Sequence, residues 1–228
     1  IRAFSTAQIV ALTTDQAAAL STAQVAALTT AQVVALQTED LNAFSTAQFA
    51  ALTTAQVGAL SALQVANLET ADLAALGTAS IKAISAANIA AMTTDQAAAL
   101  STTQVAALTT AQVVALQTED LNAFGTAQFA ALSTAQAAVL TTTQVANLET
   151  ADLAALSTGA IRALSTSAIA ALNTDEVVAL NRVAAEYGGI YDTHDRDLGA
   201  AYPGIGFLES MKEYPPSQTP GSFNLDSA

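Results

Sequence analysis

Ser21-Thr-Ala-Gln-Val-Ala-Ala-Leu28 is the stretch that decides the fold of this chain, because the same eight-residue pattern repeats without a break from Ser5 to Leu180. We number the octad positions one to eight, so that Ser21 is position one and Leu28 is position eight. Position eight is Leu in 18 of the 22 octads and Phe, Ile or Met in the others. Position five is a large apolar residue in all but three octads, where it is Ala. These two positions are therefore the candidate core.

The order of residue types within an octad predicts the start of a helix. Ser or Thr at position one, followed three residues later by Gln, Asp or Glu, is the capping-box pattern. Thr29 with Gln32 is an example, and Leu28 and Val33 stand where a hydrophobic staple closes over a helix entrance. Acidic residues concentrate at positions three and four, where the helix dipole favours negative charge. A rival frame makes the Thr at position two the N-cap.

A helix that starts in every octad must also end in every octad. A single long helix is excluded because two apolar positions per eight residues would drift by roughly 80° per octad around an α-helix. Strands fit poorly, since Ala is the commonest residue and the apolar positions do not alternate. We therefore expect an all-α solenoid of very short helices, one per octad, followed by an irregular C-terminal tail.

Single octads are too small to fold alone. Two large apolar side chains contribute about 1.5–3 kcal/mol each when buried, whereas ordering eight backbone units costs on the order of 8–16 kcal/mol. Stability must come from stacked neighbours that share one core. Position seven is almost always Ala, which indicates close approach between units or, more plainly, helix propensity.

The composition excludes several classes of function. The chain has 228 residues, a net charge of −13 and six Lys and Arg residues, which argues against a nucleic-acid partner. There is no Cys, hence no disulfide framework and no thiol chemistry. Thr and Gln interrupt the Ala-rich sequence every few residues, so no stretch reads as a membrane span.

A longer repeat of 80 residues overlies the octads, because residues 13–80 recur at 93–160 with few changes. The first domain, residues 1–180, thus holds superrepeats 1–80 and 81–160 and the start of a third. Recent duplication explains this pattern; alternatively, ten octads complete a whole number of solenoid turns. The chain opens in the second half of an octad, so we expect Ile1 to be a processed end or the start of a fragment of a longer array.

The second domain is the Tyr-, Pro- and Gly-rich tail, residues 181–228, which lacks the octad pattern. Its only chemical constellation combines three carboxylates with the single His of the chain, a set that suits a hard cation such as calcium or, through the His, a transition metal. A solvated acidic turn is the favoured alternative, because the segment lacks EF-hand spacing. The candidate metal ligands are Asp192, His194, Asp195 and Asp197.

No arrangement typical of catalysis occurs, so we expect that the chain is not an enzyme and needs no cofactor. One His cannot serve the many Ser and Thr residues, and no Gly-x-Ser-x-Gly elbow is present. The Thr at position two of nearly every octad allows a different hypothesis, a regular Thr ladder similar to the flat Thr arrays of ice-binding proteins. The simpler interpretation is that these residues belong to helix starts.

The run Leu28-Thr-Thr-Ala-Gln-Val-Val-Ala-Leu36 resembles the octapeptide arrays of long, repetitive bacterial surface or secreted proteins. The likeness covers residues 1–180 and implies a bacterial, extracellular setting without any catalytic residues. The tail resembles no family.

We therefore expect a structural, self-assembling protein, a subunit or segment of an extracellular filament, sheath or surface layer. The alternative is a surface-binding module, ice-binding or adhesin-like, that uses the Thr ladder. For self-assembly we expect head-to-tail contact between copies, since the N-terminal end follows the ordinary inner pattern and soluble solenoids carry polar caps. The aromatic residues of the tail are suited to such contacts. The candidate contact residues are Ile1, Phe4, Tyr187, Tyr191, Tyr202, Phe207 and Tyr214.

Overall fold

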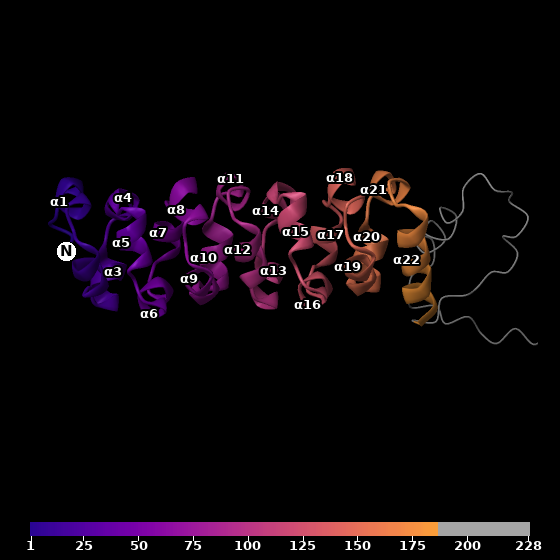
Figure 1. Ribbon diagram of the computed structural model, residues 1–228, viewed down its shortest axis with the longest axis horizontal. Coiled ribbons are helices and arrows are strands. Elements are labelled where there is room, and N and C mark those ends of the chain that lie inside the picture. Colours follow the sequence, from indigo (N-terminus) through magenta and orange to yellow (C-terminus); the bar gives the residue numbers. More distant parts are fainter. Residues whose placement is uncertain (187–228) are drawn as a thin grey trace, which may run out of the picture.

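The computed structural model describes residues 1–186, and the side chains of residues 1–180; the structural statements below concern this part of the chain. It is all-helical, with one short helix in each octad (Figure 1). The helices are α1 (Thr6–Val10), α2 (Thr14–Ala18), α3 (Thr22–Ala27), α4 (Thr30–Ala35), α5 (Thr38–Asn42), α6 (Thr46–Ala50), α7 (Thr54–Gly58), α8 (Ala62–Ala66), α9 (Thr70–Ala75), α10 (Thr78–Ala83), α11 (Ala86–Ile89), α12 (Thr94–Ala99), α13 (Thr102–Ala107), α14 (Thr110–Ala115), α15 (Thr118–Asn122), α16 (Thr126–Ala130), α17 (Thr134–Ala137), α18 (Thr142–Val145), α19 (Thr150–Ala155), α20 (Thr158–Ala163), α21 (Thr166–Ala170) and α22 (Thr174–Glu186).

The helix starts follow the frame in which position one is the N-cap. Thr29 has extended backbone angles, its hydroxyl accepts a hydrogen bond from the Gln32 N–H, and its own N–H donates to the Gln32 side chain. Most octads repeat this capping box, so the predicted frame is confirmed and the rival cap at position two is wrong. The position-two Thr is instead the first residue of the helix.

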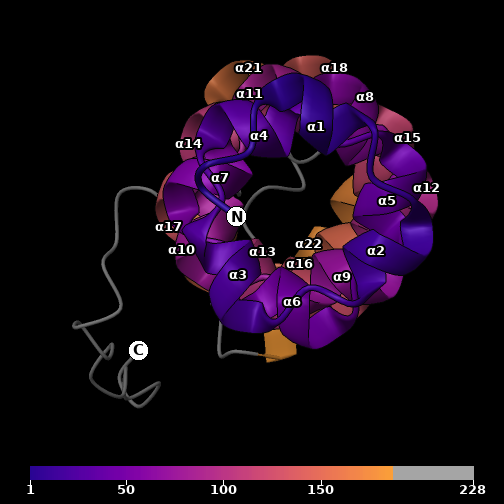
Figure 2. The same cartoon turned by 90° about the vertical axis from the view of Figure 1, so that its left-hand side faces the viewer.

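Successive helices wind into a tube. Each helix packs against the helix three octads further along the chain, as α1 does against α4, α7 against α10 and α17 against α20. Side-chain hydrogen bonds also join octads that are four apart, for example Gln56 in α7 with Leu28 at the end of α3. One superhelical turn therefore holds between three and four octads. The view along the axis shows the tube as a ring, in which α1, α11 and α21 come out on one side (Figure 2).

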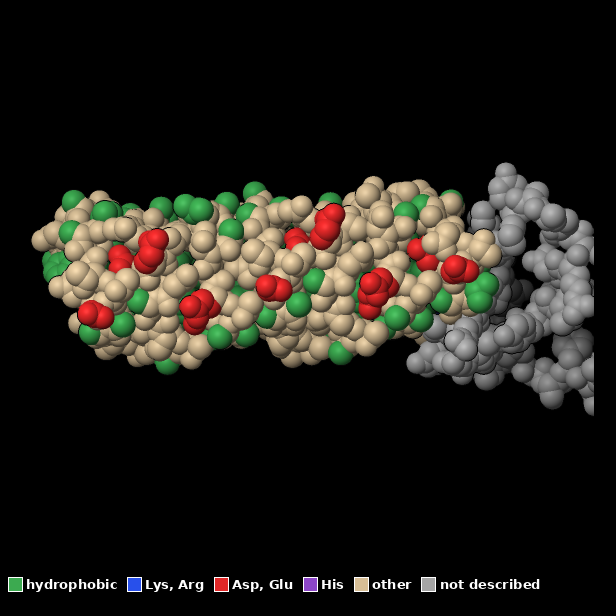
Figure 3. Space-filling view, in the orientation of Figure 1, with side chains coloured by type: hydrophobic (Ala, Val, Ile, Leu, Met, Phe, Trp, Pro, Cys, Tyr) green, Lys and Arg blue, Asp and Glu red, His purple; other side chains and the backbone are tan. Residues whose placement is uncertain are grey.

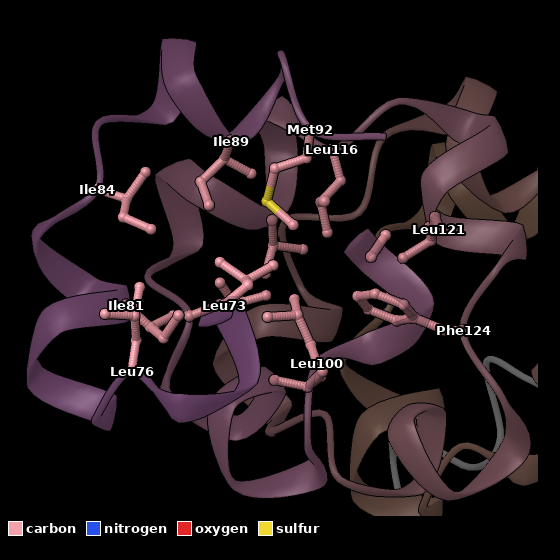
Figure 4. Close-up of a cluster of buried hydrophobic side chains, with 14 of the residues drawn as sticks. Leu73, Leu76, Ile81, Ile84, Ile89, Met92, Leu100, Leu116, Leu121 and Phe124 are labelled. Atoms are coloured by element: carbon pink, nitrogen blue, oxygen red, sulfur yellow. The ribbon is translucent and has the colours of Figure 1, made fainter. Parts of the chain in front are cut away.

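The interior of the tube is filled by positions five and eight. Val57 and Val105 at position five are completely buried, and Leu60 and Leu108 at position eight are 3% and 4% exposed. Residues from neighbouring turns meet in this core, where Ile81, Met92 and Phe124 converge (Figure 4). The prediction of an all-α solenoid with these two core positions is confirmed.

Close approach between turns is visible at one glycine. A Cβ added to Gly58 in α7 would lie 3.0 Å from the carbonyl oxygen of Ala83 in α10. Ala83 is a position-seven residue, so at this contact a small residue at position seven does lie where two turns come nearest.

The last described helix runs past the end of the octads. α22 extends from Thr174 to Glu186, beyond the expected domain boundary at residue 180. The division into a repeat domain 1–180 and a tail 181–228 remains a prediction.

Candidate functional site

Position four forms a layer of buried polar side chains between turns. Gln56, Gln104 and Gln112 are only 1–2% exposed, although Gln is a strongly polar residue. The same position is exposed in the first three octads, which have no complete turn before them. Position four is therefore buried by the preceding turn rather than by its own helix.

Each buried Gln completes the start of its own helix. The side-chain oxygen of Gln112 accepts a hydrogen bond of 2.8 Å from the Thr109 N–H, and the Thr109 hydroxyl accepts one of 3.2 Å from the Gln112 N–H. These bonds satisfy two of the N–H groups that the first turn of a helix leaves without a partner.

The amide nitrogen of the same Gln reaches the turn before. The Nε2 of Gln112 donates to the carbonyl oxygens of Ile84 and Ile81, at 2.7 and 2.8 Å, which lie at the C-terminal end of α10. Those carbonyls belong to the group that a helix end leaves without an internal partner. One side chain thus joins the start of one helix to the end of the helix four octads earlier.

This bridge recurs along the array with the same register. In every case the Nε2 donates to the carbonyl oxygen 28 residues earlier, over 2.6–3.0 Å. The residues that make it are Gln32, Gln48, Gln56, Gln64, Gln96, Gln104, Gln112, Gln128, Gln136 and Gln144.

Other residues at position four keep only part of the bridge. Asn88 donates its Nδ2 to the Leu60 carbonyl oxygen at 2.6 Å and so reproduces the contact to the earlier turn. Four octads have Asp instead, which in its ionised form can accept but not donate. For Asp40 and Asp120, one buried carboxylate oxygen, Oδ2, has no hydrogen-bond partner in the described structure.

Burial changes the acidity of these four carboxyl groups. Desolvation raises the pKa of Asp40, Asp72, Asp120 and Asp152, and an exposed Glu beside each raises it further. For Asp72, desolvation and the neighbouring Glu69 raise the pKa to about 6. At Asp120 a backbone hydrogen bond from Gln117 opposes the rise.

The residues that the sequence singled out lie elsewhere. Ile1 is partly buried against the core and Phe4 is 43% exposed, and the carbonyl oxygens of both accept from the Gln32 amide. No three His, Cys, Asp or Glu side chains within the described residues come close enough to hold a metal ion. The other candidates fall outside the described residues: Asp192, His194, Asp195 and Asp197 for a metal, and Tyr187, Tyr191, Tyr202, Phe207 and Tyr214 for assembly.

The position-two Thr side chains wind around the tube. They are exposed at the helix starts, as Thr6, Thr30 and Thr54 are. The helices that carry these three, α1, α4 and α7, pack in sequence and step around the ring rather than along one side of it (Figure 2). The Thr residues of successive turns therefore follow a spiral.

The sequence analysis missed the bridging role of position four. Glu satisfies a capping box as well as Gln does, yet in this acidic chain Gln fills position four in 13 octads and Glu in one. A preference for the residue that also donates was the available signal.

These features define the chain as a helical repeat solenoid whose turns join through one recurring polar contact. The model of the ALTTAQ repeat family matches residues 1–30, 33–69, 65–102, 113–150 and 145–182, so the chain belongs to this family. No curated protein and no solved structure matches the chain significantly. Within residues 1–186, no helix combines the length and apolarity needed to cross a membrane.

Proposed function

We propose that this chain is a structural protein that assembles head to tail with copies of itself. The supporting observation is that the contact between turns is complementary to itself. Each turn offers position-four amides on the side that faces earlier octads and helix-end carbonyls on the side that faces later octads. A surface of this kind fits another turn of the same repeat, whether that turn belongs to the same chain or to a second copy.

The first turn of this chain carries the donor half of the contact. Gln8, Gln16 and Gln24 make capping boxes with their side-chain oxygens, as the inner octads do. Their Nε2 groups, however, donate to no described residue, and all three side chains are exposed. A second copy that presents helix-end carbonyls in the register of 28 residues would satisfy them. Such a contact is heterologous, and unless it closes into a ring it gives an open filament.

The setting we propose is a bacterial extracellular filament, sheath or surface layer. The acidic, Cys-free composition is compatible with this setting, and the octad resembles the arrays of long bacterial surface proteins. In this role the chain supplies length and regular spacing and carries out no catalysis. We do not favour the ice-binding or adhesin-like alternative, because Thr residues on a spiral do not form one flat face.

Sedimentation velocity of the full chain over a wide concentration range tests this proposal. We expect association that grows with concentration, and filaments of the tube's width in electron micrographs of the concentrated protein. A chain that stays monomeric at the highest concentration contradicts it.

The donor half of the contact can be removed without changing the fold. In the triple variant Gln8→Glu, Gln16→Glu, Gln24→Glu each side chain still accepts in its capping box but no longer donates, so we expect monomers with unchanged helical circular dichroism. The matched control adds three acids at exposed inner positions, Ala47→Glu, Ala55→Glu and Ala111→Glu, and should assemble like the parent. Equal loss of assembly in both would show that added charge alone prevents association.

A further inference from the structure

The four Asp residues at position four occupy a place that elsewhere requires a donor. Asp40, Asp72, Asp120 and Asp152 are each buried to the same degree as the bridging Gln residues. They come in two pairs related by the 80-residue repeat, Asp40 with Asp120 and Asp72 with Asp152. Whatever they do is therefore repeated along the tube.

Asn88 shows what a side chain of this length can reach. Its Nδ2 lies 2.6 Å from the carbonyl oxygen of Leu60, which precedes it by 28 residues. Asp has the same shape as Asn. In the same register, the carbonyls that face the four Asp residues are those of Leu12, Phe44, Met92 and Phe124.

An ionised carboxylate at this place meets an acceptor with another acceptor. It has no proton to share with the carbonyl, which agrees with the unpartnered Oδ2 atoms of Asp40 and Asp120. A protonated carboxyl group has one O–H donor. Protonation therefore turns the Asp side chain into a substitute for the Gln amide.

We propose that these four Asp residues are acid-responsive clasps, each of which closes the contact between two turns when it takes up a proton and opens it when it ionises. The tube is then held by a complete set of bridges in mildly acidic solution, and lacks bridges at α5, α9, α15 and α19 at neutral pH. This inference concerns contacts within one chain and does not depend on the proposed assembly.

The charged neighbours favour the protonated form. In the described structure, the helices that pack against the four Asp helices, and the octads that they bridge to, carry acidic but no basic side chains. The acids on these helices and on the Asp helices themselves are Asp15, Glu39, Glu69, Asp95, Glu119, Glu149, Asp175 and Glu176, with the other buried Asp residues. Acidic side chains also gather along the face of the tube where α2, α5, α12 and α15 lie, with no basic side chain in view (Figures 2 and 3).

The direction of the pH dependence follows from the raised pKa values. A carboxyl group with a higher pKa in the folded state than in the unfolded state contributes stability that is complete below the unfolded value and lost as the pH rises through the folded value. For Asp72 the pKa rises from 3.8 to about 6. The clasp at Asp72 therefore opens between these two values, and the tube should be more stable at pH 4 than at pH 7.

Thermal unfolding of the full chain between pH 4 and pH 7.5, followed by circular dichroism, tests the clasps. We expect the melting temperature of the parent to rise by several degrees as the pH falls. The variants Asp40→Asn with Asp120→Asn, and Asp72→Asn with Asp152→Asn, carry permanent donors. Each pair should raise the melting temperature at pH 7 and remove part of its pH dependence, and all four changes together should remove most of it.

The control pair Asp15→Asn with Asp95→Asn removes the same charge from exposed positions that are also 80 residues apart. We expect this pair to keep the pH dependence of the parent. If it flattens the curve as much as the buried pairs do, general charge repulsion explains the effect and the proposal fails. The proposal also fails if calcium added to the metal-free parent at pH 7 restores the stability and the buried pairs abolish that response, because the Asp residues would then bind a cation.

Discussion

Helices α14 and α15 are neighbours in the chain and have the same buried position four, but they are joined to the previous turn in different ways. Gln112 in α14 accepts at its own helix start and donates to Ile81 and Ile84. Asp120 in α15 accepts from the backbone of Gln117 and leaves one buried oxygen without a partner. The core side chains Leu116 and Phe124 are nonetheless buried alike.

The difference separates two tasks within one octad. Apolar burial at positions five and eight supplies most of the stability, since it is present in every turn whatever stands at position four. The position-four amide satisfies the backbone groups at two helix ends, and unsatisfied groups there cost stability without abolishing the fold. Octads with Asp can therefore be accommodated, and their cost depends on pH.

The largest effect is expected from a charge in the core. Leu108→Asp places an ionised group at a site that is 4% exposed, and a buried unpaired charge in a linear stack also uncouples the octads on both sides. We expect a loss of more than about 4 kcal/mol and a visible loss of helical circular dichroism. Val114→Asp at position six, which is 46% exposed, should leave the spectrum unchanged; a similar loss there would contradict the assignment of the core.

A smaller effect is expected from the N-cap. Thr109→Ala removes the acceptor for the Gln112 N–H and should lower the free energy of unfolding by about 0.5–2 kcal/mol. Thr110→Ala, one residue later, removes an exposed side chain and should change it by less than about 0.5 kcal/mol. Denaturant unfolding measures both, and the reverse order would restore the rival frame.

The smallest effect is expected where a cap is missing. Gly125 stands at the N-cap of α16 without a side chain to accept, whereas Ser45, 80 residues earlier, accepts from the Gln48 N–H. Nothing closer than 3.8 Å blocks a Cβ at Gly125. Gly125→Ser should therefore stabilise the chain by a few tenths of a kcal/mol, measured as a shift of the unfolding midpoint; destabilisation would show that the two octads are not equivalent.

Much of the fold follows from the sequence because its determinants are local. The capping box of Thr29 with Gln32 and the apolar pair Leu28 and Val33 lie within six residues, so a single octad predicts where its helix starts and which face it buries. The repetition then predicts the solenoid.

The polar bridge could not be predicted in the same way because its two halves are 28 residues apart. The role of Gln112 depends on which octad lies above it, and hence on the number of octads per turn, which no single octad determines. The Asp residues were interpreted as helix-dipole compensation, which is correct for exposed Glu39 and incomplete for Asp40, buried next to it.

The central claim is that position four joins the turns, and the pair Gln112→Glu and Gln8→Glu tests it most directly. Both changes keep the capping-box acceptor and add one charge, but only Gln112 donates to an earlier turn. At pH 7 the free energy of unfolding should fall by about 1–3 kcal/mol for Gln112→Glu and by less than about 0.5 kcal/mol for Gln8→Glu. Equal effects of the two substitutions would contradict the claim.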